Sequence, residues 1–405
     1  MRELVLDGNE RITDGGVATL RGIGTLRTLG LAGTGITDAA LENLVAWPDL
    51  EVLNLSATLL GDEAMPHLTT SLRLRELSLN RTRVTDAGIA SLAGLPLLNT
   101  LVLDSTKVSD DGLKLVAGLP ALCTLALQGT RVRGTGLRHL RGSGIQKLGL
   151  SWLRIDDGAL GELSGLELLD ALFLSGSTIT DTGLRALRTL VNLRVVTLAG
   201  TGVNGSGLRE LERLERLEAV DLTGSGLTDE GCAHLAEHKG LKGLMLSGTR
   251  IDDAGLRHLQ DAVGIHTLEL RKTPVSDAVI PLLARFTALH CLDLNDTQVT
   301  DSGLAGLSEL VNLQSLAVDG RQASRAGMEH LAKLGTLTEL YLYGRDVTDE
   351  VLDRVRELPH LRELNLIDTH VTPTGRQALR EARPALRIRG DAPFELVRPG
   401  RALLP

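Results

Sequence analysis

The sequence predicts an α/β solenoid: a horseshoe with a parallel β-sheet on its concave face and short helices on its convex face. Three observations indicate this fold. One 24-residue pattern recurs along almost the whole chain. Each copy joins alternating leucines, typical of a half-buried strand, to leucines three residues apart, typical of a helical turn. Only 2% of the 405 residues are aromatic, so aliphatic side chains must fill the core.

The repeat is clearest between Leu289 and Leu310, which reads LHCLDLNDTQVTDSGLAGLSEL. The general pattern is L-x-x-L-x-L-x-x-T-x-[IV]-[TSD]-D-x-G-L-x-x-L-x-x-L, and it opens fifteen times. The copies start 24 residues apart, except for one interval of 23 residues. We expect a partial repeat over residues 1–25, one solenoid domain of fifteen repeats over 26–384, and a degenerate repeat with a tail over 385–405.

This pattern resembles that of the leucine-rich repeat family, L-x-x-L-x-L-x-x-N/C-x-L in units of 20–29 residues. Its second half, [IV]-T-D-x-G-L-x-x-L, is similar to the cysteine-containing-like subclass found in F-box-associated and many bacterial repeat proteins. The chain departs from the family in carrying Thr where Asn or Cys is preferred. The resemblance implies a non-enzymatic scaffold that binds proteins.

Each unit is too small to bury its own apolar face, so neighbouring repeats must stack. Stacked strands lie ~4.8 Å apart and stacked helices ~10 Å apart, and this mismatch bends the stack. The Thr before Asp suits a helix N-cap, and Thr372-Pro373 supports this because Pro favours the first helical position. We attribute the Asp that follows, as at Asp38, Asp86, Asp181 and Asp301, to the helix dipole.

Two further columns of the repeat have structural explanations. The Thr column should satisfy backbone groups where the chain leaves the strand, and it is broken at Leu153, Arg321 and Arg345. The Gly before the helical Leu, as in Gly88 and Gly303, indicates close packing between adjacent turns. Trp47, Phe286 and Cys232 fall in leucine columns and should belong to the core.

Three columns should point away from the core, toward the concave face, and they provide the candidate site. Their N-terminal half is small and neutral, whereas their C-terminal half is charged and bulky. Exposed aromatic residues and clustered charges there are candidate anchors for a partner protein. The alternatives are that scattered apolar surface residues are ordinary, and that Lys272 and Asp296 form a lateral ion pair worth ~0–1 kcal/mol. The candidate partner-binding residues are Trp152, Phe173, Glu269, Arg271, Lys272, Asp293, Asp296, Asp319, Tyr341, Tyr343 and Asp368.

Composition excludes several other functions. A net charge of −8 argues against a nucleic-acid partner, and the lack of a long apolar run argues against a membrane. The first residues contain no signal-peptide core and three cysteines make no disulfide framework, so we expect a cytoplasmic location. No arrangement of residues suggests catalysis, a metal site or a cofactor.

The predicted function is therefore a protein-binding scaffold that grips its partner on the concave face. Target recognition, enzyme inhibition and a bacterial sensor or effector role all fit this prediction. The alternative is a structural protein that self-associates through uncapped solenoid ends, above all through its N-terminal edge. At the other end, Phe394, Leu396 and Val397 are expected to fold over the last turn.

Overall fold

A computed structural model describes residues 1–390, so the predicted packing of Phe394, Leu396 and Val397 lies outside the described residues. The chain divides into two compact units: unit 1 is Met1–Thr197, and unit 2 is the described chain from Leu198 onward. The same 24-residue frame runs through both units.

In unit 1, every strand pairs in parallel with the next one along the chain. The register follows the repeat, so that Leu53 lies opposite Leu77. Its strands are β1 (Glu3–Val5), β2 (Thr28–Gly30), β3 (Val52–Asn54), β4 (Glu76–Ser78), β5 (Thr100–Val102), β6 (Thr124–Ala126), β7 (Lys147–Gly149), β8 (Ala171–Phe173) and β9 (Val195–Thr197). Its helices are α1 (Asp14–Thr19), α2 (Asp86–Ala90), α3 (Asp110–Val116) and α4 (Asp157–Gly161), with 3₁₀ segments η1 (Leu20–Gly22), η2 (Asp38–Ala46), η3 (Asp62–Thr70), η4 (Ser91–Gly94), η5 (Thr135–Leu140) and η6 (Gly183–Thr189).

Unit 2 repeats this parallel arrangement. Its strands are β10 (Ala219–Asp221), β11 (Gly243–Met245), β12 (Thr267–Glu269), β13 (Cys291–Asp293), β14 (Ser315–Asp319), β15 (Glu339–Tyr343), β16 (Glu363–Ile367) and β17 (Arg387–Gly390). Its helices are α5 (Asp229–Leu235), α6 (Asp253–Arg257), α7 (Ile280–Leu283), α8 (Asp301–Leu304), α9 (Arg325–Leu331), α10 (Asp349–Val355) and α11 (Pro373–Ala382), with 3₁₀ segments η7 (Leu208–Leu211), η8 (Asp277–Val279) and η9 (Ala305–Glu309). Strands β14, β15 and β16 have five residues, whereas β10 to β13 have three.

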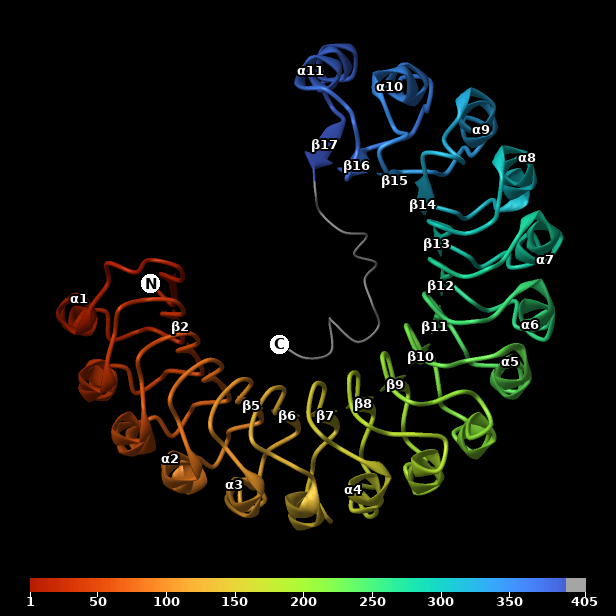
Figure 1. Ribbon diagram of the computed structural model, residues 1–405. Helices are drawn as coiled ribbons and strands as arrows, with labels where there is room; N and C mark the ends of the chain where they lie inside the picture. Colours follow the sequence, from red (N-terminus) through yellow and green to blue (C-terminus); the bar gives the residue numbers. More distant parts are fainter. Residues whose placement is uncertain (391–405) are drawn as a thin grey trace. The chain divides into compact units, whose positions relative to one another are not determined.

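Within each unit, strands line one side and short helices the other (Figure 1). Leucine columns fill the space between these layers, and residues such as Leu53, Leu77 and Leu292 are at most 1% exposed. Trp47, Phe286 and Cys232 are buried in this core, as predicted. The predicted solenoid of parallel strands and short helices is confirmed. Among residues 1–390, every helix is too short or too polar to span a bilayer.

The Thr column forms the expected ladder. In nine repeats the Thr hydroxyl donates a hydrogen bond to the carbonyl oxygen of the strand Leu three residues earlier, for example from Thr273 to Leu270 at 2.6 Å. These hydroxyls thereby satisfy carbonyl groups where the chain leaves the sheet, as a buried backbone acceptor requires.

The Asp column does more than complement a helix dipole. The Asp277 carboxylate accepts hydrogen bonds from the backbone N–H and the hydroxyl of Thr300 in the next repeat, at 2.7 and 2.6 Å. We call this contact an Asp clasp. The same contact joins Asp86 to Ser109, Asp253 to Ser276 and Asp349 to Thr372, while Asp38 and Asp301 bind Gly61 and Ser324. The dipole explanation was therefore incomplete, because each carboxylate ties its repeat to the next.

The Asp clasp also explains the Gly column. A Cβ atom added to Gly303 would lie 2.2 Å from Oδ1 of Asp277, and one added to Gly88 would lie 2.5 Å from Oδ1 of Asp62. The predicted close packing is confirmed, and the packed group is the carboxylate of the preceding repeat. Ala40, Ala64 and Val279 occupy this column in 3₁₀ segments, but Gly136 and Gly183 do so as well, so the column does not determine the type of helix.

Candidate protein-binding site

The ends of strands β12 to β16 in unit 2 surround a hollow of about 340 Å³. Six of the predicted residues line it, and they come from five consecutive repeats. They are Arg271, Lys272, Asp296, Asp319, Tyr343 and Asp368, joined by Asn295, Gly320, Arg321, Gly344 and Asp346. We call this feature the unit 2 hollow.

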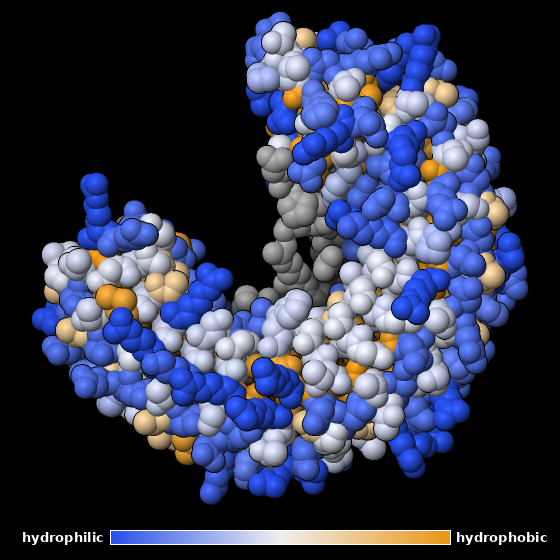
Figure 2. Space-filling view, in the orientation of Figure 1, coloured by the Kyte–Doolittle hydropathy of each residue, from blue (hydrophilic) through white to orange (hydrophobic). Residues whose placement is uncertain are grey.

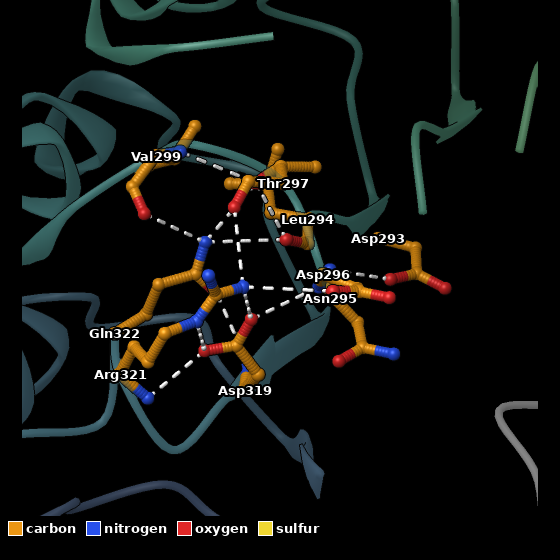
Figure 3. Close-up of polar contacts among 9 residues, drawn as sticks. All are labelled: Asp293, Leu294, Asn295, Asp296, Thr297, Val299, Asp319, Arg321 and Gln322. Atoms are coloured by element: carbon orange, nitrogen blue, oxygen red, sulfur yellow. Dashed lines mark hydrogen bonds and ion pairs between the residues drawn. The ribbon is translucent and has the colours of Figure 1, made fainter. Parts of the chain in front are cut away.

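Arg321 organises the charges of the hollow (Figure 3). Its guanidinium donates to both carboxylate oxygens of Asp319, at 2.8 and 3.3 Å, and its Nη2 lies 3.6 Å from Oδ1 of Asp296. The hydrogen bond and charge of Asp319 raise the pKa of Arg321 above its ordinary value. Asp296 therefore pairs with Arg321, and the alternative pairing with Lys272 is wrong. Such a two-point contact between Arg and a carboxylate fixes the geometry of both groups.

Gln322 anchors the loop that presents Arg321 (Figure 3). This side chain is only 1% exposed, and its Nε2 lies 3.1 Å from both the Thr297 hydroxyl and the Val299 carbonyl oxygen. Its Oε1 accepts a hydrogen bond from the backbone N–H of Asp319 at 3.0 Å. The break in the Thr column at Arg321 thus arises because Gln322, one residue later, enters the interior instead.

The aromatic residues of unit 2 are less exposed than predicted. Tyr341 and Tyr343 are each 6% exposed and pack with Ala317 and Ile367 in one cluster. Burial raises the pKa of the Tyr341 hydroxyl above its ordinary value. The guanidinium of Arg271 lies 5.0 Å from the ring centroid of Tyr343, within cation–π range. Tyr343 therefore supports Arg271 beside the hollow, and the expectation of two exposed tyrosine anchors was wrong.

Glu269 and Asp293 lie opposite each other on β12 and β13, outside the set of residues that line the hollow. Each is only 3% exposed. The Asp293 carboxylate accepts a hydrogen bond from the backbone N–H of Asn295 at 2.8 Å. These two carboxylates belong to the sheet face and not to the accessible edge of the site.

Several site residues occupy strained backbone positions. Lys272, Asp296 and Asp368 have φ angles of 56°, 59° and 53°, in the left-handed region, where equivalent repeats carry Gly224 and Gly248. A side chain in this conformation costs roughly 1–2 kcal/mol relative to a right-handed one, and such strain tends to gather at functional sites. The side chains at these positions therefore carry a local cost that glycine would avoid.

In unit 1, the two predicted aromatics behave differently. Phe173 is only 5% exposed, so its expected exposure was wrong, whereas Trp152 is 66% exposed. Trp152 also has a left-handed φ of 60°. A Cβ atom on Gly176 would lie 2.3 Å from the indole Cε3, so the ring lies directly against that backbone. Trp152 is thus an exposed aromatic with a supported face.

Comparisons with known proteins agree with this repeat architecture. A family model described as leucine-rich repeat matches residues 287–308 and 357–379. An internalin of Listeria monocytogenes has a similar structure, with 21% identity, 84% of this chain and 86% of that chain covered, and a TM-score of 0.52. The chain has the leucine-rich repeat fold. No curated protein matches it by sequence.

Two complexes contain chains whose structures are similar to this one. One is a receptor kinase ectodomain of Arabidopsis thaliana with CASPARIAN STRIP INTEGRITY FACTOR 2, at 17% identity and a TM-score of 0.50, covering 96% of this chain and 50% of that one. The other is TLR13 with ssRNA13, at 20% identity and a TM-score of 0.59, covering 91% of this chain and 56% of that one. The present chain spans about half the length of these two chains, and the likeness shows a shared fold.

Sequence reasoning missed three residues that shape the site. Arg321 appeared only as an interruption of the Thr column, and Gln322 was not singled out. Asp346 lines the hollow but stands in a loop where the repeat pattern fails. The interruption itself was the available signal, because where the structural Thr is lost the next side chain, Gln322, enters the interior and bonds to the Leu294 and Val299 carbonyl oxygens of the preceding repeat.

Proposed function

We propose that this protein is a non-catalytic scaffold that binds a partner protein through the sheet side of its repeats, with the unit 2 hollow as the main contact. The observation that carries the proposal is the hollow itself, which brings together charged side chains from five repeats. The roles that fit are target recognition, inhibition of an enzyme, and a bacterial sensor or effector function.

The hollow suits a polar protein contact. Arg321 and Asp319 are held rigidly, while Lys272 and Asp368 are exposed at its edge. Rigid charged groups bind with little loss of side-chain entropy, and complementary charges determine which partner fits. Figure 2 shows a largely hydrophilic visible face with apolar side chains in small separate patches, so charge is the main source of specificity there.

The comparison structures support a binding role without identifying the ligand. The Arabidopsis ectodomain is complexed with another factor, and TLR13 with RNA. For the present chain we favour a protein because the net charge is −8, which opposes binding of a phosphate backbone.

The proposal is tested by capturing partners from the native host with the full chain. The test variant is Lys272→Glu with Asp368→Lys, which reverses two exposed charges of the hollow. The matched control is Lys333→Glu with Glu350→Lys, which makes the same exchange at exposed positions near the helices of unit 2. We expect a partner that the native chain and the control retain and the test variant loses. Equal capture by all three proteins would place binding elsewhere.

A second candidate function is self-association through the N-terminal edge. Val5 of β1 is 55% exposed, and Leu4 and Leu6 are only partly buried, whereas the equivalent Leu29 and Leu31 of the next repeat are each 1% exposed. Light scattering over a wide concentration range tests this function. A mass that stays at one chain throughout would contradict it, and Val5→Lys should abolish any dimer that forms.

A further inference from the structure

Unit 1 carries a row of cations that the unit 2 hollow does not involve. Arg83, Lys107, Arg131 and Arg154 occupy the same position in four consecutive repeats, just before the buried Val or Ile that starts the helical half. All four side chains are exposed. We call these four residues the basic row.

Three of the four residues in the row are held by a backbone hydrogen bond to the preceding repeat. The backbone N–H of Arg83 donates to the Leu60 carbonyl at 2.8 Å, that of Lys107 to Val84 at 2.9 Å, and that of Arg131 to Val108 at 2.8 Å. The positions therefore repeat with the spacing of the solenoid.

The side chains of the basic row form no ion pairs within the described chain. Other arginines of unit 1 form ion pairs, as Arg27 does with Glu51 at 2.8 Å and Arg141 with Glu162 at 2.9 Å. Over residues 1–390, the basic row forms no such pair. Its charges are thus available to a partner.

Several carboxylates of the same repeats already accept hydrogen bonds from backbone N–H groups. Asp86 accepts hydrogen bonds from Ser109, Asp110 from Gly134, and Asp157 from Thr180. Asp104 accepts one from the backbone N–H of Gln128, and burial raises its pKa. These fixed negative charges repel a phosphate backbone, which is charged at every nucleotide. A peptide can instead place separate carboxylates directly against the row.

Trp152 stands beside the row, two residues before Arg154. One side of its indole lies against Gly176, and the left-handed positions on either side of it along the repeats are Gly129 and Gly176. The residue is 66% exposed, so the other side of the ring is open to a partner. An aromatic with an apolar body and an N–H donor at its edge is a frequent interface anchor.

The spacing of the row selects an extended partner. Strands stack ~4.8 Å apart and helices ~10 Å apart, so residues between the two layers lie roughly 5–10 Å apart from repeat to repeat. Alternate residues of an extended chain lie on one face, roughly 6.6–6.8 Å apart. We propose that the basic row binds an extended acidic segment of a protein, with carboxylates at alternate residues and an apolar residue against Trp152.

The partner class rests on the proposed protein-binding function, but the site is separate from the unit 2 hollow. A row variant that loses the acidic segment and still captures the unit 2 partner shows that the two sites act independently. If no partner binds the unit 2 hollow but the acidic segment still binds the basic row, only the proposed function is contradicted.

The test uses labelled peptides and the full chain. The main probe alternates Glu and Thr and ends in Leu; the controls are a peptide of the same composition with its Glu residues grouped, the alternating Lys peptide, and single-stranded oligodeoxythymidylate. Fluorescence anisotropy measures binding, and acrylamide quenching follows Trp152, because Trp47, the other tryptophan, is only 1% exposed. Bound peptide should protect Trp152 from the quencher.

The test variant is Arg83→Glu with Arg131→Glu, and the matched control is Lys114→Glu with Arg138→Glu, which changes charge equally in two of the four repeats but on the helical side. We expect the alternating Glu peptide to bind best and the test variant to weaken it by about tenfold or more, with little effect of the control. Equal effects of both variants, failure of the peptide to bind, or tighter binding of the oligonucleotide would each overturn the proposal. Melting curves establish that both variants are folded.

Discussion

The Asp clasp should require glycine at the Gly column, and the substitution Gly303→Ala tests this requirement. The new Cβ would lie 2.2 Å from Oδ1 of Asp277, so the carboxylate must move and its bonds to Thr300, at 2.7 and 2.6 Å, must weaken. Hydrogen bonds to a charged group contribute about 1.5–3 kcal/mol each, and the lower end applies to this exposed pair. Replacing Gly by Ala in a helix returns about 1 kcal/mol. The net expected loss is about 1–3 kcal/mol of unfolding free energy.

A double-mutant cycle with Asp277→Ala isolates the cause. Without the carboxylate the new methyl group has less to displace, so Gly303→Ala should become neutral or stabilising in that background. Urea unfolding of the four proteins gives the free energies, and hydrogen exchange of α8 reports the local effect. Val279 occupies the Gly column of its own repeat, and there Asp253 keeps both hydrogen bonds to Ser276. The segment Asp277–Val279 is a 3₁₀ helix, which indicates one way in which the backbone can relax. Additive effects of the two substitutions would refute the proposed clash.

Three further predictions concern unit 2. Gln322→Ala should lower stability by about 2–4 kcal/mol, because it removes the side-chain bonds to the buried Val299 carbonyl oxygen and to the backbone N–H of Asp319, and urea unfolding measures this loss. His238 is 6% exposed in a leucine column, and burial lowers its pKa despite the opposing charges of Glu212 and Glu237. The unfolded chain therefore takes up the proton first, and stability should fall as pH drops below ~6.5. His238→Leu should reduce that slope, and an unchanged slope in urea titrations at pH 5 and pH 7 would contradict the assignment. Lys272→Gly should raise stability by about 1 kcal/mol by relieving its left-handed backbone while weakening partner capture, and a lower melting temperature would count against strain at this position.

The periodic features of the fold were predictable from the sequence. A leucine, threonine or glycine that returns every 24 residues must occupy the same environment in every repeat, so the columns revealed the core, the hydroxyl ladder and the close packing. The Asp clasp was visible as a column but was assigned to the helix dipole. Its true partner lies 23 residues away in the chain, and periodicity alone does not reveal which groups of neighbouring repeats meet.

The candidate site was predicted only in part. The charged columns located the residues of the hollow, but Arg321 and Gln322 escaped because they depart from the repeat. The exposure of Phe173, Tyr341 and Tyr343 was predicted wrongly. The alternating pattern of a strand predicts which face of the sheet a side chain lies on, but not how far neighbouring side chains bury it. Trp152 is exposed as expected, because its left-handed position lies beyond the strand.

The Asp clasp has a consequence for how such a chain changes its length. Each clasp joins one repeat only to the next, as from Asp277 to Thr300. A tandem duplication of the 24 residues from Asp277 to Thr300 would supply one new carboxylate and one new Thr, and would leave neither group unmatched. Whole repeats can therefore be gained or lost by genetic duplication and deletion without redesign of their neighbours, so the extent of the binding surface is open to evolution while the joints between repeats stay the same.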